Sequence, residues 1–487
     1  MRLSQRVSAS VSAVAAMAAV AAGVALPASA AATGGSGGTW AAARQVRTPA
    51  TQPQAGTGIV SDACAPKGYC AAVGTYWPAG RLGISNPYVV IDKNGSVGNL
   101  QHVNTAPLVN GPLSSHGDAE AEMDFVACPS AANCVALGDY NSFEFGIYPF
   151  VVNEKNGRWG KAHPIAGIAA LGLAITATPT ALACSSAGNC VAGGTFSNST
   201  QPEDTVPFVV SEKDGVWGAA QTIPGLPSEA DIDQGNILLA CAPASCLGVG
   251  FYQGGQVNTE FVVSERGGAW GHAGMVPGLP KGSAPAMVSC SPDGTCTVAG
   301  YGSAAQRGTM FTIIDHKGVW GSESLVPGTA ITGQNYNLNA ISCPAAGDCS
   351  IGGWHTNARN QFTPWVAAEH GGHWSKADDV PGLAALDGGL DSQLTTLACA
   401  TVGNCAAGGL VNVHVTRKTI RIEAFVVSEA GGKWGKGILV PGIVKLDGDG
   451  NSDTSAIACA TASHCIAGGD YEHNGKFSLY TFISVER

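Results

Sequence analysis

The chain has 487 residues, a formal net charge of −10 at pH 7, 67 glycines and 16 cysteines, and only 12% of its residues are charged. We expect no nucleic-acid partner, because phosphate contacts need clustered lysines and arginines, and this chain is acidic. Abundant glycine and frequent β-branched residues, without the charge periodicity of helices, favour many short strands joined by tight turns.

Residues 1–30 are predicted to be a secretory signal peptide. Arg2 and Arg6 precede an alanine-rich apolar run at 11–26, and small residues at 28–30 supply a cleavage site. This apolar run is short for a membrane anchor. Removal of residues 1–30 takes away two arginines and no acids, which changes the formal charge from −10 to −12. We expect a secreted, extracellular protein without a membrane span.

The cysteines define a repeat. They form eight close pairs, seven with five intervening residues and one with four, and a glycine follows each second cysteine by four residues. Successive pairs lie roughly 50 to 65 residues apart, a period typical of propellers and solenoids. An exported chain meets an oxidising environment, so we predict eight local disulfides. The predicted bridges join Cys64 with Cys70, Cys128 with Cys134, Cys184 with Cys190, Cys241 with Cys246, Cys290 with Cys296, Cys343 with Cys349, Cys399 with Cys405 and Cys459 with Cys465.

Each repeat contains four predicted strands. Strand A runs into the first cysteine, and strand B runs from the second cysteine to the glycine. Strand C is an apolar run such as residues 208–210, followed by an acid, and strand D starts at a Gly-x-Trp turn such as residues 215–217. A four-stranded antiparallel sheet repeated radially is a propeller blade. Because one acid recurs after every strand C, we interpret these acids as structural contacts.

The chain ends predict how the ring closes. The eighth repeat stops after strand C at Arg487, and residues 38–46 form an orphan strand D that parallels residues 215–223. Closure removes free strand edges. We predict an all-β, eight-bladed propeller of four antiparallel strands per blade, in which the N-terminal strand completes the last blade. Residues 31–57 are the closing strand and linker, residues 58–487 form a single domain with 38–46, and we expect a monomer.

The recurring Cys-x5-Cys, Phe-Val-Val-x-Glu and Gly-x-Trp segments resemble a group of secreted bacterial β-propeller repeat proteins, mostly without assigned activity. The resemblance spans residues 38–487 and implies architecture rather than chemistry. The Gly-x-Trp turn also resembles the tryptophan motif of quinoprotein dehydrogenases, but their adjacent cysteine pair is absent. Residues 211–217 resemble the Asp-box of sialidases, with the aspartate one position late.

Candidate ligand-binding residues lie where the repeats differ. The B–C and D–A loops share one face around the central channel, where acids and aromatic residues gather; aromatic faces stack on sugars or other flat ligands. The predicted ligand-binding residues are Tyr76, Trp77, Tyr140, Glu120, Glu122, Asp124, Asp233, Trp354, Asp391 and Tyr471.

The D–A loop before the eighth repeat has alternating oxygen donors, Asp447, Asp449, Asn451 and Asp453, separated by glycines and a serine. Ca²⁺ prefers several oxygen ligands from one tight loop, so we predict a possible Ca²⁺ cofactor there. No catalytic residue is identified. We expect a secreted binding propeller for an extracellular glycan or protein ligand. The alternative is a secreted glycoside hydrolase or lyase that uses carboxylates at the channel mouth.

Overall fold

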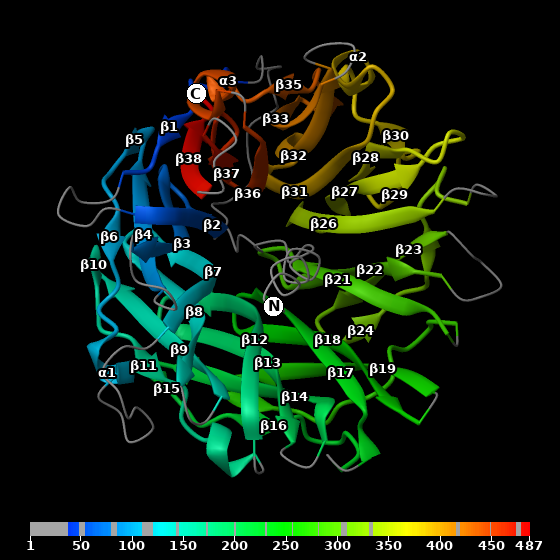
Figure 1. The fold of residues 1–487 in the computed structure, drawn as a ribbon. Coiled ribbons are helices and arrows are strands. Elements are labelled where there is room, and N and C mark those ends of the chain that lie inside the picture. The colour runs from blue at the N-terminus through cyan, green and yellow to red at the C-terminus, as the bar shows by residue number, and fades with distance from the viewer. Residues whose placement is uncertain are drawn as a thin grey trace, which may run out of the picture.

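The computed structural model shows an eight-bladed β-propeller, with eight sheets arranged as a ring around a central axis (Figure 1). It describes residues 38–47, 54–78, 85–109, 120–142, 146–171, 174–198, 201–228, 231–255, 257–280, 282–302, 309–330, 335–414, 419–448, 450–473 and 479–487. The predicted signal peptide lies outside these residues. No helix in the described part of the chain is long and apolar enough to cross a membrane.

Every blade uses the predicted strand order. The innermost strands A of blades 1 to 8 are β2 (Gln54–Ala65), β7 (Glu120–Ser130), β12 (Ala174–Ser186), β17 (Gln234–Ala242), β21 (Ala284–Cys290), β26 (Tyr336–Ala345), β31 (Ser392–Thr401) and β36 (Ser452–Thr461). The strands B are β3 (Tyr69–Pro78), β8 (Asn133–Ser142), β13 (Asn189–Asn198), β18 (Ser245–Gly254), β22 (Thr295–Tyr301), β27 (Asp348–Thr356), β32 (Asn404–His414) and β37 (His464–Glu472).

The two outer strands complete each sheet. The strands C are β4 (Asn86–Lys93), β9 (Gly146–Lys155), β14 (Gln201–Lys213), β19 (Val257–Arg266), β23 (Met310–His316), β28 (Phe362–His370), β33 (Ile420–Ala430) and β38 (Leu479–Val485). The strands D start directly after the C–D turns as β5 (Ser96–Val97), β10 (Arg158–Trp159), β15 (Val216–Trp217), β20 (Ala269–Trp270), β24 (Val319–Trp320), β29 (His373–Trp374) and β34 (Lys433–Trp434), all but β5 with the Gly-x-Trp motif. In blade 8, Trp40 forms an isolated bridge with Glu486, and β1 (Arg44–Gln45) is the later part of strand D.

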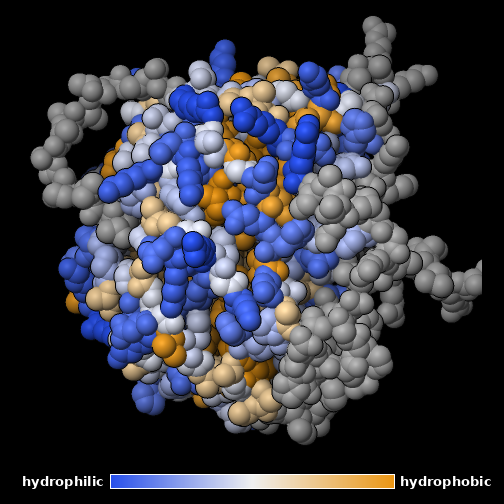
Figure 2. Space-filling view, turned by 90° about the vertical axis from the view of Figure 1, so that its left-hand side faces the viewer, coloured by the Kyte–Doolittle hydropathy of each residue, from blue (hydrophilic) through white to orange (hydrophobic). Residues whose placement is uncertain are grey.

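Short elements lie along the rim and in the D–A connections. Six strands D continue as β6 (Gln101–His102), β11 (His163–Pro164), β16 (Gln221–Thr222), β25 (Ser324–Leu325), β30 (Asp378–Asp379) and β35 (Ile438–Leu439). The helices are α1 (Ala106–Val109), α2 (Leu383–Asp387) and α3 (Ile443–Asp447), with a 3-10 turn at Ile168–Ala170. Figure 2 shows hydrophilic side chains over one side of the ring, with apolar residues between them.

The N-terminal strand closes the ring as predicted. β1 pairs antiparallel with β38, and Trp40 pairs with Glu486 in the register that Trp217 has with Glu212. The Nε1 atom of Trp40 donates to Ser428 Oγ in blade 7 at 2.9 Å, as Trp217 Nε1 donates to Asn153 Oδ1 in blade 2 at 3.2 Å. The first strand and the last blade therefore form the same contacts as an uninterrupted blade.

The core lies between blades. Ile59 and Ala72 of blade 1, for example, cluster with Ala456 and Ile466 of blade 8. The recurring glycine of strand B lets strand A of the same blade approach it closely, since a Cβ at Gly194 would lie 2.3 Å from Thr178 O. A side chain at this position would displace the neighbouring strand, which explains the glycine in every repeat.

All eight predicted disulfides are present, and the described residues contain no free cysteine. Each bridge joins strands A and B near their hairpin. The bridges of blades 1 to 4 join Cys64 with Cys70, Cys128 with Cys134, Cys184 with Cys190 and Cys241 with Cys246. Those of blades 5 to 8 join Cys290 with Cys296, Cys343 with Cys349, Cys399 with Cys405 and Cys459 with Cys465.

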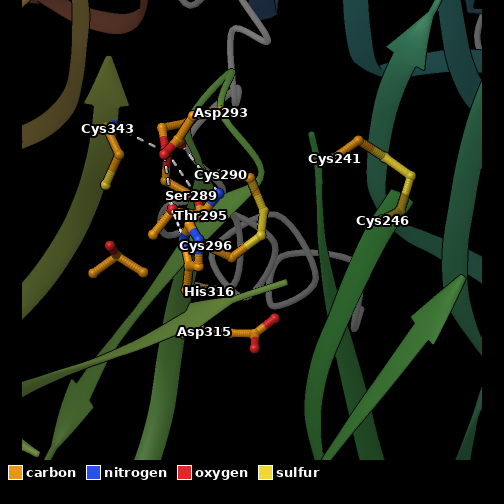
Figure 3. Close-up of a disulfide and its surroundings, with 12 residues drawn as sticks. Cys241, Cys246, Ser289, Cys290, Asp293, Thr295, Cys296, Asp315, His316 and Cys343 are labelled. Atoms are coloured by element: carbon orange, nitrogen blue, oxygen red, sulfur yellow. Dashed lines mark hydrogen bonds between the residues drawn. A yellow bond between two sulfur atoms is a disulfide. The ribbon is translucent and has the colours of Figure 1, made fainter. Parts of the chain in front are cut away.

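The surroundings of one bridge show how the hairpin contacts the next blade. Figure 3 shows Cys290 bonded to Cys296 at the end of strands β21 and β22. Next to it, Ser289 Oγ accepts a hydrogen bond from the Cys343 amide of the following blade at 3.1 Å. Disulfides persist in oxidising compartments, so the eight bridges suggest an oxidising environment.

The acids after strand C are buried, as structural contacts should be; four of them bond to the preceding blade, and Glu265 and Asp315 accept amides of their own turns. All eight side chains are buried: Asp92, Glu154, Glu212, Glu265, Asp315, Glu369, Glu429 and Glu486. Asp92 Oδ2 lies 2.8 Å from His464 Nε2 of blade 8, and Glu154 accepts a hydrogen bond from Tyr69 of blade 1. These acids are structural contacts at the blade interfaces.

Candidate functional site

Comparison of equivalent positions singles out blades 8, 1 and 2. One such position is the residue after the strand B glycine, which lies opposite a residue of strand A on the same face of the hairpin. In blade 2 this pair is Asp139 and Glu122, and in blade 8 it is Asp470 and Asp453. Like charges placed directly opposite each other on a sheet are destabilising. Two blades on either side of blade 1 thus carry an unfavourable arrangement that the other blades lack.

Asp470 links blade 8 to blade 1. Its Oδ1 atom accepts hydrogen bonds from the Ile59 amide at 3.0 Å and from Thr481 Oγ1 at 3.2 Å. A Cβ at Gly58 would lie 3.4 Å from Asp470 Oδ2, so glycine leaves room for this carboxyl. Burial and, second, repulsion by Asp453 raise the pKa of Asp470 well above its usual value. Burial raises the pKa of Asp453 to about 6.

Asp139 of blade 2 lacks the backbone amide donor that Asp470 has. In blades 1 and 8 the residue after the glycine accepts the amide of the next blade, as Thr75 Oγ1 does from Met123 at 3.1 Å. The corresponding residue of blade 3 is Pro179, which has no amide hydrogen. Burial and the nearby Glu122 raise the pKa of Asp139 to about 7. Asp139 is therefore only partly ionised at neutral pH.

Asp124 stands where four other blades have a side-chain hydrogen-bond donor. It lies in the β-bulge between Met123 and Phe125, four residues before the first cysteine. The equivalent side chains donate to carbonyls of the next blade: Thr180 to Ile237, Asn339 to Leu394, Thr395 to Thr454 and Ser455 to Ile59. An ionised carboxylate cannot donate, and Asp124 Oδ2 is buried without a hydrogen-bond partner among the described residues.

Neighbouring carboxyls further disfavour the ionised form of Asp124. Burial, followed by repulsion from Asp139 and Glu122, raises the pKa of Asp124 well above its usual value. The pKa of Glu122 is raised by burial and by Glu120, and is lowered by a hydrogen bond with Ser85. Glu122 is exposed, whereas Asp124 and Asp139 are partly exposed. Blade 2 therefore presents three interacting carboxyls with access to solvent.

Blade 1 contributes a different acid, Asp62, two residues before its first cysteine. Its side chain is fully buried, and both carboxyl oxygens lack a hydrogen-bond partner in the described structure. Burial raises the pKa of Asp62 well above its usual value. The other seven blades have an aliphatic residue at this position: Val126, Leu182, Leu239, Val288, Ile341, Leu397 and Ile457.

The predicted aromatic surface is mostly inside the protein. Tyr76, Tyr140 and Tyr471 are each 3% exposed and pack in the hydrophobic clusters, so we do not retain them as ligand-contacting residues. Trp77 and Trp354 are partly exposed, and Trp354 contacts Phe362 with ring centroids 4.4 Å apart. These two rings do not form one continuous surface with the buried tyrosines.

The remaining predicted acids lie at different places on the loop face. Glu120 Oε2 accepts a hydrogen bond from Asn141 at 3.4 Å beside the carboxyls of blade 2. Asp233 is exposed in the connection before blade 4. Asp391 Oδ1 accepts the Phe362 amide at 2.8 Å and so supports the connection between blades 6 and 7. Of these three, only Glu120 belongs to the carboxyl cluster of blade 2.

The described residues of the predicted calcium loop point to separate partners. Asp447 is buried and accepts a hydrogen bond from Ser452 Oγ at 3.2 Å. Asn451 Oδ1 accepts the Ile422 amide at 3.1 Å. Asp453 lies opposite Asp470, and Asp449 lies outside the described residues. Asp447 and Asn451 thus each have a protein partner, and calcium binding by this loop stays a prediction.

An internal cation occupies the same region. Arg421 Nη2 lies 3.0 Å from Glu423 Oε1, and Arg421 Nη1 donates to the Gly448 carbonyl. Glu423 is fully buried; burial and the nearby Asp447 raise its pKa to about 7, although Arg421 and Ser452 lower it. The arginine thus supplies the positive charge that these carboxyls need.

Sequence reasoning missed Asp62, Asp139 and Asp470. A position-by-position comparison of the eight repeats contains the signal, because each acid replaces an aliphatic, aromatic or hydroxyl residue found in other blades. Inspection of loops alone does not find it, since all three acids lie within strands β2, β8 and β37.

No family model and no curated protein matches the chain. Solved structures similar to it include a prolyl endopeptidase (10% identity, 87% of this chain and 54% of that chain, TM-score 0.44) and a polysaccharide lyase described as an ulvan lyase (9%, 78% and 95%, 0.42). A sialidase variant from Streptococcus pneumoniae is similar at 11% identity, with 89% and 92% covered and a TM-score of 0.35. Likeness at this level concerns the propeller fold alone.

Proposed function

We propose that the protein is an exported ligand-binding propeller whose ligand contacts the carboxyls of blades 8 and 2, on either side of blade 1. The supporting observation is the pair of opposed acids that blades 2 and 8 carry at the same position, Glu122 with Asp139 and Asp453 with Asp470. Neighbouring carboxylates repel each other unless a proton or a cation neutralises one of them. A ligand with protonated amino groups supplies this neutralisation.

Binding of an amino-bearing glycan tests the proposal. Chitosan oligosaccharides carry protonated amines, and fully N-acetylated oligosaccharides of the same length are the neutral comparison. We expect the double substitution Glu122→Gln, Asp139→Asn to weaken binding about tenfold, as the loss of two partly exposed charge contacts implies. Asp231→Asn, Asp233→Asn removes two acids from the loops of blade 4 and should leave binding unchanged.

The pH dependence gives a second readout. Asp139, with a pKa of about 7, and Asp453, with a pKa of about 6, lose their protons as the pH rises. Ionised carboxylates bind cations more strongly, so affinity should increase from pH 5.5 to pH 7 for N-trimethylated chitosan oligosaccharides, whose positive charge does not change with pH. Equal affinity for amino-bearing and N-acetylated ligands, or equal effects of the two double substitutions, would contradict the proposal.

A second candidate is a carbohydrate-active enzyme. It is favoured by one observation: Asp139, partly protonated near pH 7, lies opposite Glu122. Glycoside hydrolysis uses a protonated carboxyl together with an ionised one. Release of reducing ends or unsaturated sugars from a panel of polysaccharides, lost in Asp139→Asn, would support this candidate over simple binding.

A further inference from the structure

The face opposite the loop face is formed by the A–B and C–D turns of every blade. In blades 1, 2, 3, 6 and 7 a backbone hydrogen bond joins the two turns, for example from Gly157 N to Ala132 O and from Gly215 N to Gly188 O, both 2.8 Å long. We call this surface the disulfide face, because the eight cysteine pairs lie beneath it. It is separate from the carboxyls of the proposed ligand site.

Basic side chains recur on the disulfide face at one position, directly after the buried acid of strand C. They are exposed in four consecutive blades, as Lys93, Lys155, Lys213 and Arg266. In blade 5 the next residue along, Lys317, is exposed, and in blade 8 the position is Arg487. A molecule with a formal charge of −10 thus has a basic arc on one end.

The basic groups extend from each blade over the next one. A Cβ at Gly215 would lie 3.1 Å from Lys155 Nζ, and one at Gly268 would lie 3.3 Å from Lys213 Cδ. One at Gly318 would lie 3.8 Å from Arg266 Nη2. The turn glycines offer no side chain there, so the three basic groups form a continuous series across blades 2 to 5.

Acids on the same face are few. Asp214 and Asp293 are exposed in the described turns, and Asp348 pairs with His370, with 3.7 Å between the carboxyl oxygen and the ring nitrogen. The strand C acids are buried and do not reach solvent. Charged clusters of one sign attract oppositely charged ligands and raise their local concentration.

We propose that the basic arc of the disulfide face binds a linear acidic polysaccharide. A flexible polymer with a repeated negative charge can follow basic groups that recur once per blade around a ring. The face is poorly suited to a bilayer, because interfacial binding uses large apolar residues, whereas the exposed large apolar residues of its turns are three valines from separate blades, Val216, Val319 and Val402. Proteins that bind single-stranded nucleic acid use exposed aromatic side chains on which bases stack. On this face Trp217 is half-buried, and its Nε1 atom donates a hydrogen bond to Asn153 of the preceding blade.

Retention on immobilised heparin and titration with polygalacturonate test this inference, with dextran as the neutral polymer. We expect the parent to bind both acidic polymers in low salt and to release them as salt screens the charges. The triple substitution Lys155→Gln, Lys213→Gln, Arg266→Gln should weaken binding about tenfold, and Lys155→Arg, Lys213→Arg should retain it.

The matched control removes three exposed basic residues of the loop face, Arg47→Gln, Arg359→Gln and Lys445→Gln. It changes the net charge equally and should leave polymer binding intact. Thermal melts establish that each variant is folded. Equal loss in both triple variants, no binding by the parent, or preferential binding to anionic phospholipid vesicles or single-stranded DNA would overturn the proposal. The amino-bearing glycan assay is independent of this outcome, because it addresses the other face.

Discussion

Blades 8, 1 and 2 differ from blades 4 to 7 at the residue that follows the strand B glycine. In the first group this residue is Asp470, Thr75 or Asp139, whereas in the second it is Phe251, Tyr301, Trp354 or Leu410. Tyr301 keeps the backbone contact, since its Oη accepts the Leu338 amide at 3.0 Å as Thr75 Oγ1 accepts that of Met123, whereas Phe251 and Leu410 have no side-chain acceptor. The side chains therefore vary in chemistry on a constant scaffold.

This difference indicates where function lies in a repeat protein. Residues common to all blades build the ring, such as the buried acids after strand C. Acids that destabilise a few neighbouring blades are not explained by the fold, because apolar or hydroxyl residues occupy the same position in other blades. A functional role explains them. The opposed carboxyls of blades 2 and 8 and the buried Asp62 between them meet this description.

The largest expected effect concerns the closing strand, which belongs to the carboxyl-bearing group of blades. Deletion of residues 31–47 removes β1 and Trp40 and leaves β38 with an unpaired edge. We expect the melting temperature to fall by at least about 10 °C, or the protein to aggregate, because free edges pair with other chains. Deletion of residues 31–37, which keeps the strand, should have no such effect in calorimetry and size-exclusion chromatography. A stable monomeric 31–47 deletion would contradict the closure.

A smaller effect is expected from Asp62→Val, which gives blade 1 the residue that blade 2 has at Val126. An unsatisfied buried polar group costs about 1–3 kcal/mol, so the substitution should stabilise the fold by about that amount at pH 7. Val126→Asp is the reverse control and should destabilise it. Urea unfolding measures both.

The pH dependence of Asp62 has a definite sign. Its pKa is raised in the folded state, so the unfolded state ionises first as the pH rises above about 3.8. Parent stability should therefore fall with rising pH relative to Asp62→Val, and the difference should be smallest near pH 3, where only the cost of burying the protonated carboxyl remains. A difference that is independent of pH would show that packing rather than ionisation sets the effect.

The sequence predicted the architecture because the repeat is carried by local features. Cysteine spacing, the strand B glycine and the orphan Gly-x-Trp at the N-terminus each have one structural meaning in a blade. The candidate site was harder because side chains alternate across a strand, so a shift of one residue changes the face. Tyr76, Tyr140 and Tyr471 lie directly after Thr75, Asp139 and Asp470, and they are buried while these neighbouring positions contact the next blade.

Loop composition was misleading for a related reason. The acids of the D–A connections suggested solvent-facing ligands, but Asp387 and Asp447 at the ends of α2 and α3 are buried and accept hydrogen bonds from Ser392 and Ser452. Each of these acids is held by a serine only five residues further along the chain, so it stabilises its own loop.

The smallest expected effect concerns the D–A connections before blades 7 and 8, which differ in one basic residue. Gln361 donates to the Gly389 carbonyl before blade 7, as Arg421 donates to the Gly448 carbonyl before blade 8, where Glu423 adds a carboxyl. Because the guanidinium already neutralises Glu423 and Asp447, we expect little calcium-dependent change in the melting temperature of the parent.

Arg421→Gln copies the connection before blade 7 and leaves Glu423 and Asp447 without a cation. Calcium should then stabilise this variant by about 1 kcal/mol at roughly 5 mM, if the dissociation constant is on the order of 1 mM. Melts with EDTA and with calcium measure the effect, and adding Asp447→Asn should remove it. A clear calcium shift in the parent would instead support the original prediction that this loop binds calcium with Arg421 in place. A calcium response of Arg421→Gln that survives Asp447→Asn would place the ion elsewhere.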